Sequence, residues 1–269
     1  MNVSRQGYYK HMRKLEARLD NDEQILSQVC KIRNLLNYPG VKKLHVMVNK
    51  SLAGTGVKIS RDRLTELLRQ RDMLNNKKTK FCRTSISERG AVPFPNLIKN
   101  LAINRTNQVW VSDITYISIL QGFCYLSLIT DVYSRKIVGF NLSRRMNAED
   151  VLIAMEKACS DFNPGQGLIH HSDKGSQYGS KLYTSFLMER GIVSSMTGAG
   201  RCFDNPIAER VNGILKQEFG LGKVIRDFGT ALKLVKDAIH LYNSYRLHNS
   251  LGLQTPDSVY FREEADDAA

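Results

Sequence analysis

Apolar residues recur at intervals of three or four over the first part of the chain, which predicts helices. One helix is predicted over 24–37 and a short second one over 41–50. Ser60 is a favourable N-cap for a third helix that continues to about Arg71. With a glycine-containing turn before the last helix, this pattern predicts either a helix-turn-helix or a plain three-helix bundle.

From Val109 onward the pattern changes to β-rich runs separated by short turns, and helices and strands then alternate. The predicted strands are 109–120, 122–132, 135–143, 168–173 and 192–196, and the predicted helices are 148–161, 180–190, 205–219 and 230–245. This order predicts an α/β fold of the ribonuclease-H-like type, a mixed five-stranded sheet flanked by helices. A small all-α, helix-turn-helix-like domain precedes it.

Between these two regions the chain is polar, contains two prolines and shows little periodicity, which is typical of a linker. The predicted organisation is a helical N-terminal segment, a helix-turn-helix-like domain, a linker, a ribonuclease-H-like core with a C-terminal helix, and an acidic tail. Their respective ranges are 1–23, 24–75, 76–107, 108–262 and 263–269.

Composition narrows the class of protein. The chain has 269 residues, of which 42% are hydrophobic and 24% charged, so a disordered chain, a fibrous repeat and a small disulfide scaffold are excluded. Five cysteines without a C-x-x-C pair predict free thiols. No apolar run approaches a membrane span and no secretory signal is visible, so we expect a cytoplasmic protein without membrane contact.

The positive charge is confined to one region. The first 100 residues carry 21 basic and 8 acidic side chains, which accounts for the whole net charge of +13. Such a local excess predicts a surface that binds a polyanion, with nucleic acid favoured over an anionic membrane or a solubility surface. In a helix-turn-helix the third helix enters the major groove. The candidate DNA contacts are therefore Arg61, Arg63 and Arg69, together with Lys42 and Lys43 of the second helix.

Three carboxylates occupy positions in the predicted elements where they could bind a metal ion together. Asp113 interrupts an apolar strand, Asp173 follows the carboxyl end of a buried strand, and Glu209 lies on a helix, with 35 residues between the last two. Each alone is explained equally well by a turn or a solvated helix face. Together they form a set of hard oxygen ligands that suits Mg²⁺. Lys216 lies two turns after Glu209 on the same helix face, where it can hold a phosphate.

Several segments carry a family resemblance. They are VSRQGYYK near the start, NQVWVSDITYI around Asp113, LITDVYSRKIVGF, HHSDKGSQYGS around Asp173, GRCFDNPIAERVNGILKQEF around Glu209, and YNSYRLHNSLGLQTP. With these motifs the chain resembles the second-reading-frame product of insertion-sequence-three-type bacterial transposases, which have a retroviral-integrase-like catalytic core. The resemblance covers most of residues 108–256 and is looser over 38–75.

The resemblance implies a ribonuclease-H-like fold, metal ligation by Asp113, Asp173 and Glu209, and DNA contact by Lys216. It also implies partners: the terminal inverted repeats of the element, target DNA, further copies of the chain on DNA, and an upstream-frame protein or fusion that supplies a leucine zipper. The chain itself shows no sustained leucine heptad repeat. A bacterial, nucleoid-associated location follows from the same resemblance.

Other polar residues near these motifs have simpler interpretations. Asp131 is expected to orient Ser134 or Arg135. His170 and His171 are adjacent on a strand and point to opposite faces, so a hydrogen-bonding role is favoured over shared metal ligation. The loop with Lys174, Ser176, Gln177 and Tyr178 is either a DNA contact, through Lys174 and Gln177 above all, or a plain polar loop.

Together these features predict a DNA transposase with Mg²⁺, for which Mn²⁺ can substitute. It would cleave a phosphodiester at an element end and transfer the freed 3′-OH to a second strand. Two alternatives remain open: a ribonuclease-H-type nuclease that does not join strands, and a non-catalytic DNA-binding regulator of transposition.

Overall fold

The computed structural model describes residues 5–37, 39–74, 94–161, 167–198 and 205–267. The chain divides into two compact units, Met1–Phe81 and Cys82–Ala269. The division falls inside the predicted linker 76–107, of which residues 76–93 lie outside the described part of the chain. Each unit is described by itself below.

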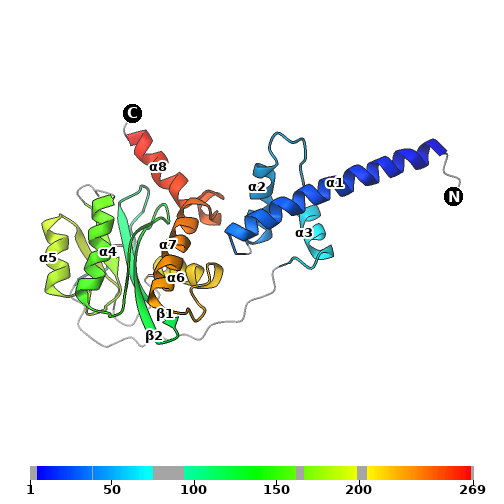
Figure 1. Cartoon of the computed structure of the whole chain (residues 1–269). Helices are drawn as coiled ribbons and strands as arrows, with labels where there is room; N and C mark the ends of the chain where they lie inside the picture. Colours follow the sequence, from blue (N-terminus) through cyan, green and yellow to red (C-terminus); the bar gives the residue numbers. More distant parts are fainter. Residues whose placement is uncertain (1–4, 38, 75–93, 162–166, 199–204, 268–269) are drawn as a thin grey trace. The chain divides into compact units, whose positions relative to one another are not determined.

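The first unit consists of α1 (Arg5–Leu35), α2 (Val41–Ser51) and α3 (Arg61–Gln70) (Figure 1). Ser60 caps α3 as predicted, because its side chain accepts a hydrogen bond from the backbone N–H of Arg63. Apolar side chains from all three helices form the core: Ile25, Val29, Ile32, Leu44, Val48, Leu52, Ile59, Leu64, Leu67 and Leu68.

The predicted boundary between residues 23 and 24 is wrong. α1 passes through this position as one continuous helix of 31 residues. The physical reason is the absence of any glycine or proline between Tyr8 and Leu35, so nothing interrupts the helix after it leaves the core of the unit.

The second unit is built on a five-stranded sheet in the order β3-β2-β1-β4-β5. β1 (Val109–Ile119), β2 (Gly122–Asp131) and β3 (Ile137–Ser143) form the predicted antiparallel meander. β4 (Ile169–Ser172) pairs in parallel with β1, and β5 (Val193–Met196) in parallel with β4. This topology is the predicted ribonuclease-H-like one.

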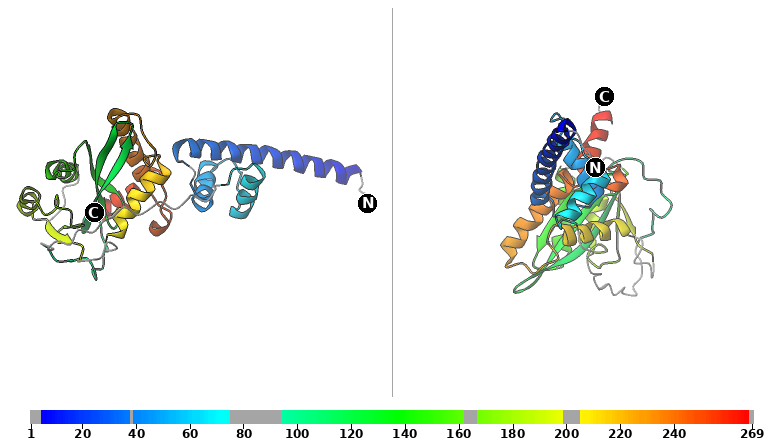
Figure 2. Two further views of the ribbon diagram at one scale, coloured as in Figure 1. Left: turned by 90° about the horizontal axis from the view of Figure 1, so that it is seen from below. Right: turned by 90° about the vertical axis from the view of Figure 1, so that its right-hand side faces the viewer.

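Helices cover both faces of this sheet (Figures 1 and 2). α4 (Ala148–Asp161) and α5 (Lys181–Glu189) share a core with Trp110, Ile129 and Val138 on one face. α6 (Pro206–Glu218) and α7 (Phe228–Ser244) share a second core with Ile117, Leu126 and Leu128 on the other face. Because side chains alternate along β1, Asp113 has the same parity as Ile117 and therefore faces α6.

Close packing of α4 on β3 depends on Gly139. A Cβ atom at this position would lie 2.4 Å from the carbonyl oxygen of Ala154 and 2.7 Å from Cβ of Ala158. Only a residue without a side chain allows the helix to approach the strand this closely.

The C-terminal end differs from the sequence prediction. After a 3₁₀ turn at Asn249–Leu251, an additional helix, α8 (Pro256–Asp267), includes most of the predicted acidic tail 263–269. Tyr260 of α8 is fully buried in the core beneath α4 and α5, so packing of the beginning of the helix stabilises it. Among the described residues, no helix is long and apolar enough to cross a membrane.

Candidate active site

Asp113 lies in the middle of β1 with its carboxylate held on both oxygens. Oδ1 accepts a hydrogen bond of 3.0 Å from the backbone N–H of Ile114, and Oδ2 accepts one of 2.7 Å from Nδ2 of Asn212 on α6. The parallel register of β1 and β4 pairs Val111 with His171. Continued by two residues, this register brings Asp173 beside Asp113.

The pKa of Asp113 reports its surroundings. The pKa of Asp113 is raised from 3.8 to about 7, first by burial, then by the charge of Asp173 and, to a smaller extent, by the charge of Glu209. The hydrogen bonds from Asn212 and Ile114 act in the opposite direction. Asp173 and Glu209 are therefore each within electrostatic reach of Asp113.

Asp173 begins a tight turn after β4. Its Oδ1 accepts a 2.9 Å hydrogen bond from the backbone N–H of Gly175, and a Cβ atom on Gly175 would lie 3.0 Å from the same oxygen. Desolvation of the carboxyl group raises the pKa of Asp173, although the residue as a whole is exposed, and the hydrogen bond from Gly175 lowers it.

The loop that follows Asp173 is more closely packed than a plain polar loop. Gln177 donates a 3.1 Å hydrogen bond from Nε2 to the carbonyl oxygen of Met146, and Lys174 is half-buried. Tyr178, expected with them at the DNA surface, is instead buried, with 2% of its surface exposed. Its aromatic ring packs against His170 and Tyr183, which explains why it turns inward.

Glu209 lies in the first turn of α6, where the helix dipole favours a negative charge, and its side chain is exposed. Asn205 occupies the predicted N-cap position, but its side chain makes no capping hydrogen bond. Instead Nδ2 donates a 2.8 Å hydrogen bond to the carbonyl oxygen of Ser112. The start of α6 is thereby fixed to β1, next to Asp113.

Lys216 lies near the same site. Its Nζ is 4.4 Å from the centroid of the Tyr116 ring, a cation–π contact. Burial lowers the pKa of Lys216, whereas Tyr116 and the charge of Asp113 raise it. The cation is thus partly desolvated beside the carboxylates, an environment in which a phosphate group would be attracted strongly.

The donor set fits a divalent cation in its chemistry. All the donors are hard oxygens, and Asp113 is a buried carboxylate whose pKa the charges of Asp173 and Glu209 raise in addition to burial. Oδ1 of Asn212 is buried and has no hydrogen-bond partner among the described residues. Within that same part of the chain, however, no group of three or more His, Cys, Asp or Glu side chains is close enough together to hold a metal ion.

Asn212 is the residue that the sequence interpretation misses. Its place on the same helix face as Glu209 is a visible signal, but its contact with Asp113 requires two segments 99 residues apart. The amide positions one of the carboxylates and is itself buried.

The other predictions near the site concern structural residues, and they are confirmed. Asp131 is fully buried, and its Oδ1 accepts hydrogen bonds of 2.7 and 2.6 Å from the backbone N–H and the hydroxyl of Ser134. His170 Nε2 lies 2.6 Å from the hydroxyl of Ser112. Burial lowers the pKa of His170 to about 3, so it is neutral near pH 7. His171 Nδ1 lies 2.9 Å from the hydroxyl of Ser195.

The candidate DNA contacts of the first unit are less accessible than expected. Arg61 and Arg69 of α3 form ion pairs with Asp62 and Glu66 of the same helix. The expectation that Arg63 is exposed is wrong, because it is half-buried in an ion pair with Asp22 of α1. Of the two lysines on α2, Lys42 is exposed and Lys43 is half-buried.

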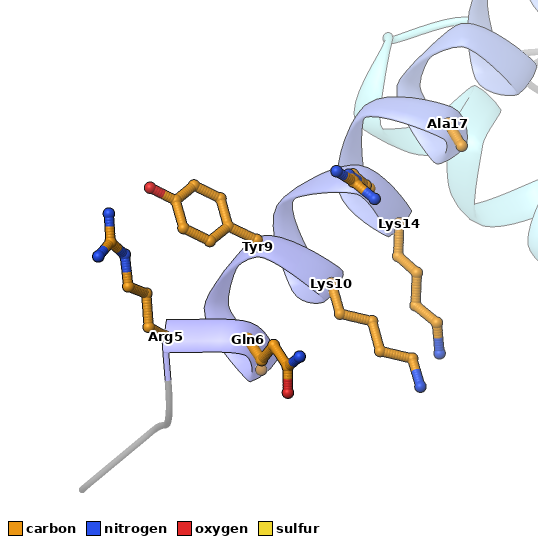
Figure 3. A pocket seen from close by; sticks show the side chains of 8 residues that line it. Arg5, Gln6, Tyr9, Lys10, Lys14 and Ala17 are labelled. Carbon is orange, nitrogen blue, oxygen red and sulfur yellow. The ribbon is translucent and has the colours of Figure 1, made fainter.

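A further basic surface lies on α1. Arg5, Tyr9, Lys10, Arg13 and Lys14 line a shallow open pocket along one side of the helix (Figure 3). All five residues are exposed, and none takes part in an ion pair among the described residues. This surface adds to the positive charge of the first unit.

Comparison with known proteins agrees with the fold. Two family descriptions, both named Integrase core domain, match residues 103–202 and 190–256. The "Insertion element IS600 uncharacterized 31 kDa protein" of Shigella sonnei is 34% identical over 97% of this chain and 96% of its own length. The "Transposase for insertion sequence element IS629" of the same species is 32% identical over 91% of this chain and 82% of its own length.

Among solved structures, the HTLV-2 integrase catalytic core domain in complex with magnesium is similar over 58% of this chain and 97% of that chain, at 17% identity and a TM-score of 0.47. The fold and the two family matches define an integrase-type core. Taken with its full-length relatives, the chain belongs to the transposases of bacterial insertion sequences that carry an integrase core domain.

Proposed function

We propose that this transposase performs both of its chemical steps with Asp113, Asp173 and Glu209. The observation that carries the proposal is the raised pKa of Asp113, to which the charges of the other two carboxylates contribute. A buried carboxylate that is also within electrostatic reach of two others is costly unless a cation compensates it.

In this proposal the three carboxylates hold Mg²⁺, or Mn²⁺ in its place, and Asn212 orients Asp113. The bound ions would activate the attacking oxygen and stabilise the leaving oxygen. Glu209 is exposed, which leaves its side chain room to turn towards the other two carboxylates. Lys216 holds a phosphate of the DNA next to them as a point charge.

Two displacements at phosphorus follow. In the first, the oxygen of a water molecule attacks the phosphorus at an element end and forms a new P–O bond, the P–O3′ bond breaks, the flanking strand keeps the 5′-phosphate, and the element strand leaves with a 3′-OH. In the second, this 3′-OH attacks a phosphodiester of target DNA, and the target strand leaves with its own 3′-OH. Each step breaks one P–O bond and forms one, and neither requires a covalent enzyme intermediate or an oxidant.

Double-stranded DNA, as inverted repeats and target, is the proposed partner. The first unit contacts phosphates through α1 and through Lys42, Lys43, Arg61 and Arg69, whereas Lys174 and Gln177 lie beside the cleaved strand. Further copies of the chain on DNA, and an upstream-frame protein or fusion, belong to the same proposal. Arg63 is left out because, unlike Arg61 and Arg69, its side chain is largely buried in its ion pair.

Neutralising two lysines of α1 tests the DNA contact. In Lys10→Gln/Lys14→Gln, the slope of log K against log salt is expected to fall by about 1.8, since each lost phosphate contact contributes roughly 0.9. Fluorescence anisotropy with a labelled duplex measures the slope. Lys233→Gln/Lys236→Gln, which removes the same charge from exposed positions on α7, is the matched control and should leave the slope unchanged. Equal slopes for all three proteins would exclude α1 from the DNA contact.

The activity itself is tested by strand transfer. The purified chain is mixed with supercoiled plasmid and a labelled duplex that ends in the flanking inverted repeat, in Mg²⁺ or Mn²⁺. Labelled joined product is expected. Nicking without joining would favour the nuclease alternative. Binding without either reaction would indicate a regulator or a missing upstream partner, and the fused protein separates these two cases.

A further inference from the structure

The N-terminal half of α1 buries no side chain against the other described residues of the first unit. Buried side chains of this helix begin at Ile25, and none occurs between residues 5 and 24. Figures 1 and 2 show α1 continuing well beyond α2 and α3. Most of the stability of a helix in a protein comes from packing of an apolar face, and this half of α1 lacks such packing among the described residues.

Four apolar side chains form a narrow seam along this exposed half. Tyr8, Met12, Leu15 and Leu19 are separated by four, three and four residues, the spacing of alternating d and a positions in a heptad repeat. Tyr8, Leu15 and Leu19 are 55%, 40% and 53% exposed. We define these four residues as the α1 seam.

The α1 seam ends where the unit's own packing begins. The next position in the repeat is Asp22, which pairs with Arg63 of α3. The position after that is Leu26, which packs against the core of the first unit. The α1 seam is thus the part of the repeat that the described residues of the first unit leave uncovered.

The side of α1 away from the α1 seam is basic. At about 100° per residue, Lys10, Arg13 and Lys14 lie roughly opposite the α1 seam, and Figure 3 shows Lys10 and Lys14 on the same side of the helix. Contact through the α1 seam therefore leaves this charged face exposed.

The charges that flank the α1 seam favour pairing with an identical helix in parallel orientation. Glu16 and Glu23 occupy e positions, and His11 and Arg18 occupy g positions. In a parallel pair of identical helices, each g position faces the e position five residues further along the other helix. Arg18 then faces Glu23 of the second copy, and His11 faces Glu16 of the second copy.

An antiparallel pair has the opposite consequence. It brings e positions next to e positions and g positions next to g positions. Glutamates would then face glutamates, and Arg18 would approach His11 or Arg18 of the second copy. Like charges placed at these positions repel, so the antiparallel arrangement is disfavoured.

We propose that residues 8–22 of α1 form a parallel two-stranded coiled coil with a second copy of this chain. The C-terminal half of α1 is already fixed by the core of the first unit, so the exposed half extends an existing helix and needs no new nucleus. The dimer depends on neither metal nor DNA, and its test is therefore independent of the proposed catalysis.

Sedimentation equilibrium of the full chain without DNA tests the proposal. A monomer–dimer equilibrium in the micromolar range is expected for the natural chain. Leu15→Lys/Leu19→Lys is expected to be monomeric, and because both leucines are exposed, the circular dichroism spectrum should be unchanged. A chain that is monomeric throughout, or a dimer that survives this double substitution, would overturn the proposal.

Charge reversal tests the parallel direction. Arg18→Glu should weaken the dimer by about tenfold, because it replaces two attractive pairs by repulsive ones. Arg18→Glu/Glu23→Lys should restore the natural dissociation constant. Lys10→Glu, the same change of charge on the opposite side of the helix, is the matched control and should have little effect. Failure of the second reversal to rescue the first would exclude the parallel register.

Discussion

Glu209→Gln is expected to reduce strand transfer by about a thousandfold or more, equivalent to about 4 kcal/mol in the activation free energy. The substitution keeps the size of the side chain but removes the charge that the metal site requires. Single-turnover conversion of the labelled duplex, normalised to bound DNA, measures the effect. DNA affinity should be equal or slightly higher, because a negative charge near the phosphates has been removed.

A matched control separates this loss from a general effect of charge. Glu189→Gln removes the same charge from an exposed position at the end of α5 and should leave the rate unchanged. If Glu209→Gln retained activity within about tenfold of the natural chain, Glu209 would not belong to the reacting site.

Asp113→Asn is expected to stabilise the metal-free protein at pH 8 by up to about 4 kcal/mol. The pKa of Asp113 is raised from 3.8 to about 7, so the folded protein binds this proton more tightly than the unfolded chain does. The stability of the natural chain therefore decreases as pH rises from about 4 to 7. The asparagine variant should not lose stability in this way, and the free energies of unfolding of the two proteins should be similar near pH 4.

Urea unfolding in a chelating buffer measures this difference. Trp110, the sole tryptophan, is buried in the catalytic unit and reports its unfolding by fluorescence. His170 acts in the opposite direction, since its lowered pKa costs stability as pH falls below about 6.5, but it does so equally in both proteins. Addition of Mg²⁺ should stabilise the natural chain and not the variant. A variant that is less stable than the natural chain at pH 8 would refute the crowding of carboxylates.

Local patterns were sufficient to predict the sheet and the positions of the three carboxylates. The alternation of apolar residues along β1 already places Asp113 on a buried strand, and Ser60 predicts the start of α3 because an N-cap depends on its immediate neighbours. The predicted role of Asp131 also holds, since Ser134 is only three residues away.

Long-range contacts were not predictable in the same way. The Arg63–Asp22 ion pair joins residues 41 positions apart, and Asn212 reaches Asp113 across 99. Tyr178 turns inward because its ring packs against two other aromatic rings. Its polar neighbours in the sequence do not indicate this packing. The α1 seam was not predicted either. Its heptad positions are occupied by tyrosine, methionine and leucine, so a pattern that requires leucine at each position does not identify it.

The central claim is that Asp113, Asp173 and Glu209 form one site for divalent cations. Anomalous diffraction at the manganese absorption edge, from crystals of the full chain grown with Mn²⁺, tests it most directly. The account predicts anomalous density among the three carboxylates, with Glu209 turned towards the other two, and its loss in Asp113→Asn. Density elsewhere, or none among ordered carboxylates at saturating Mn²⁺, would contradict it.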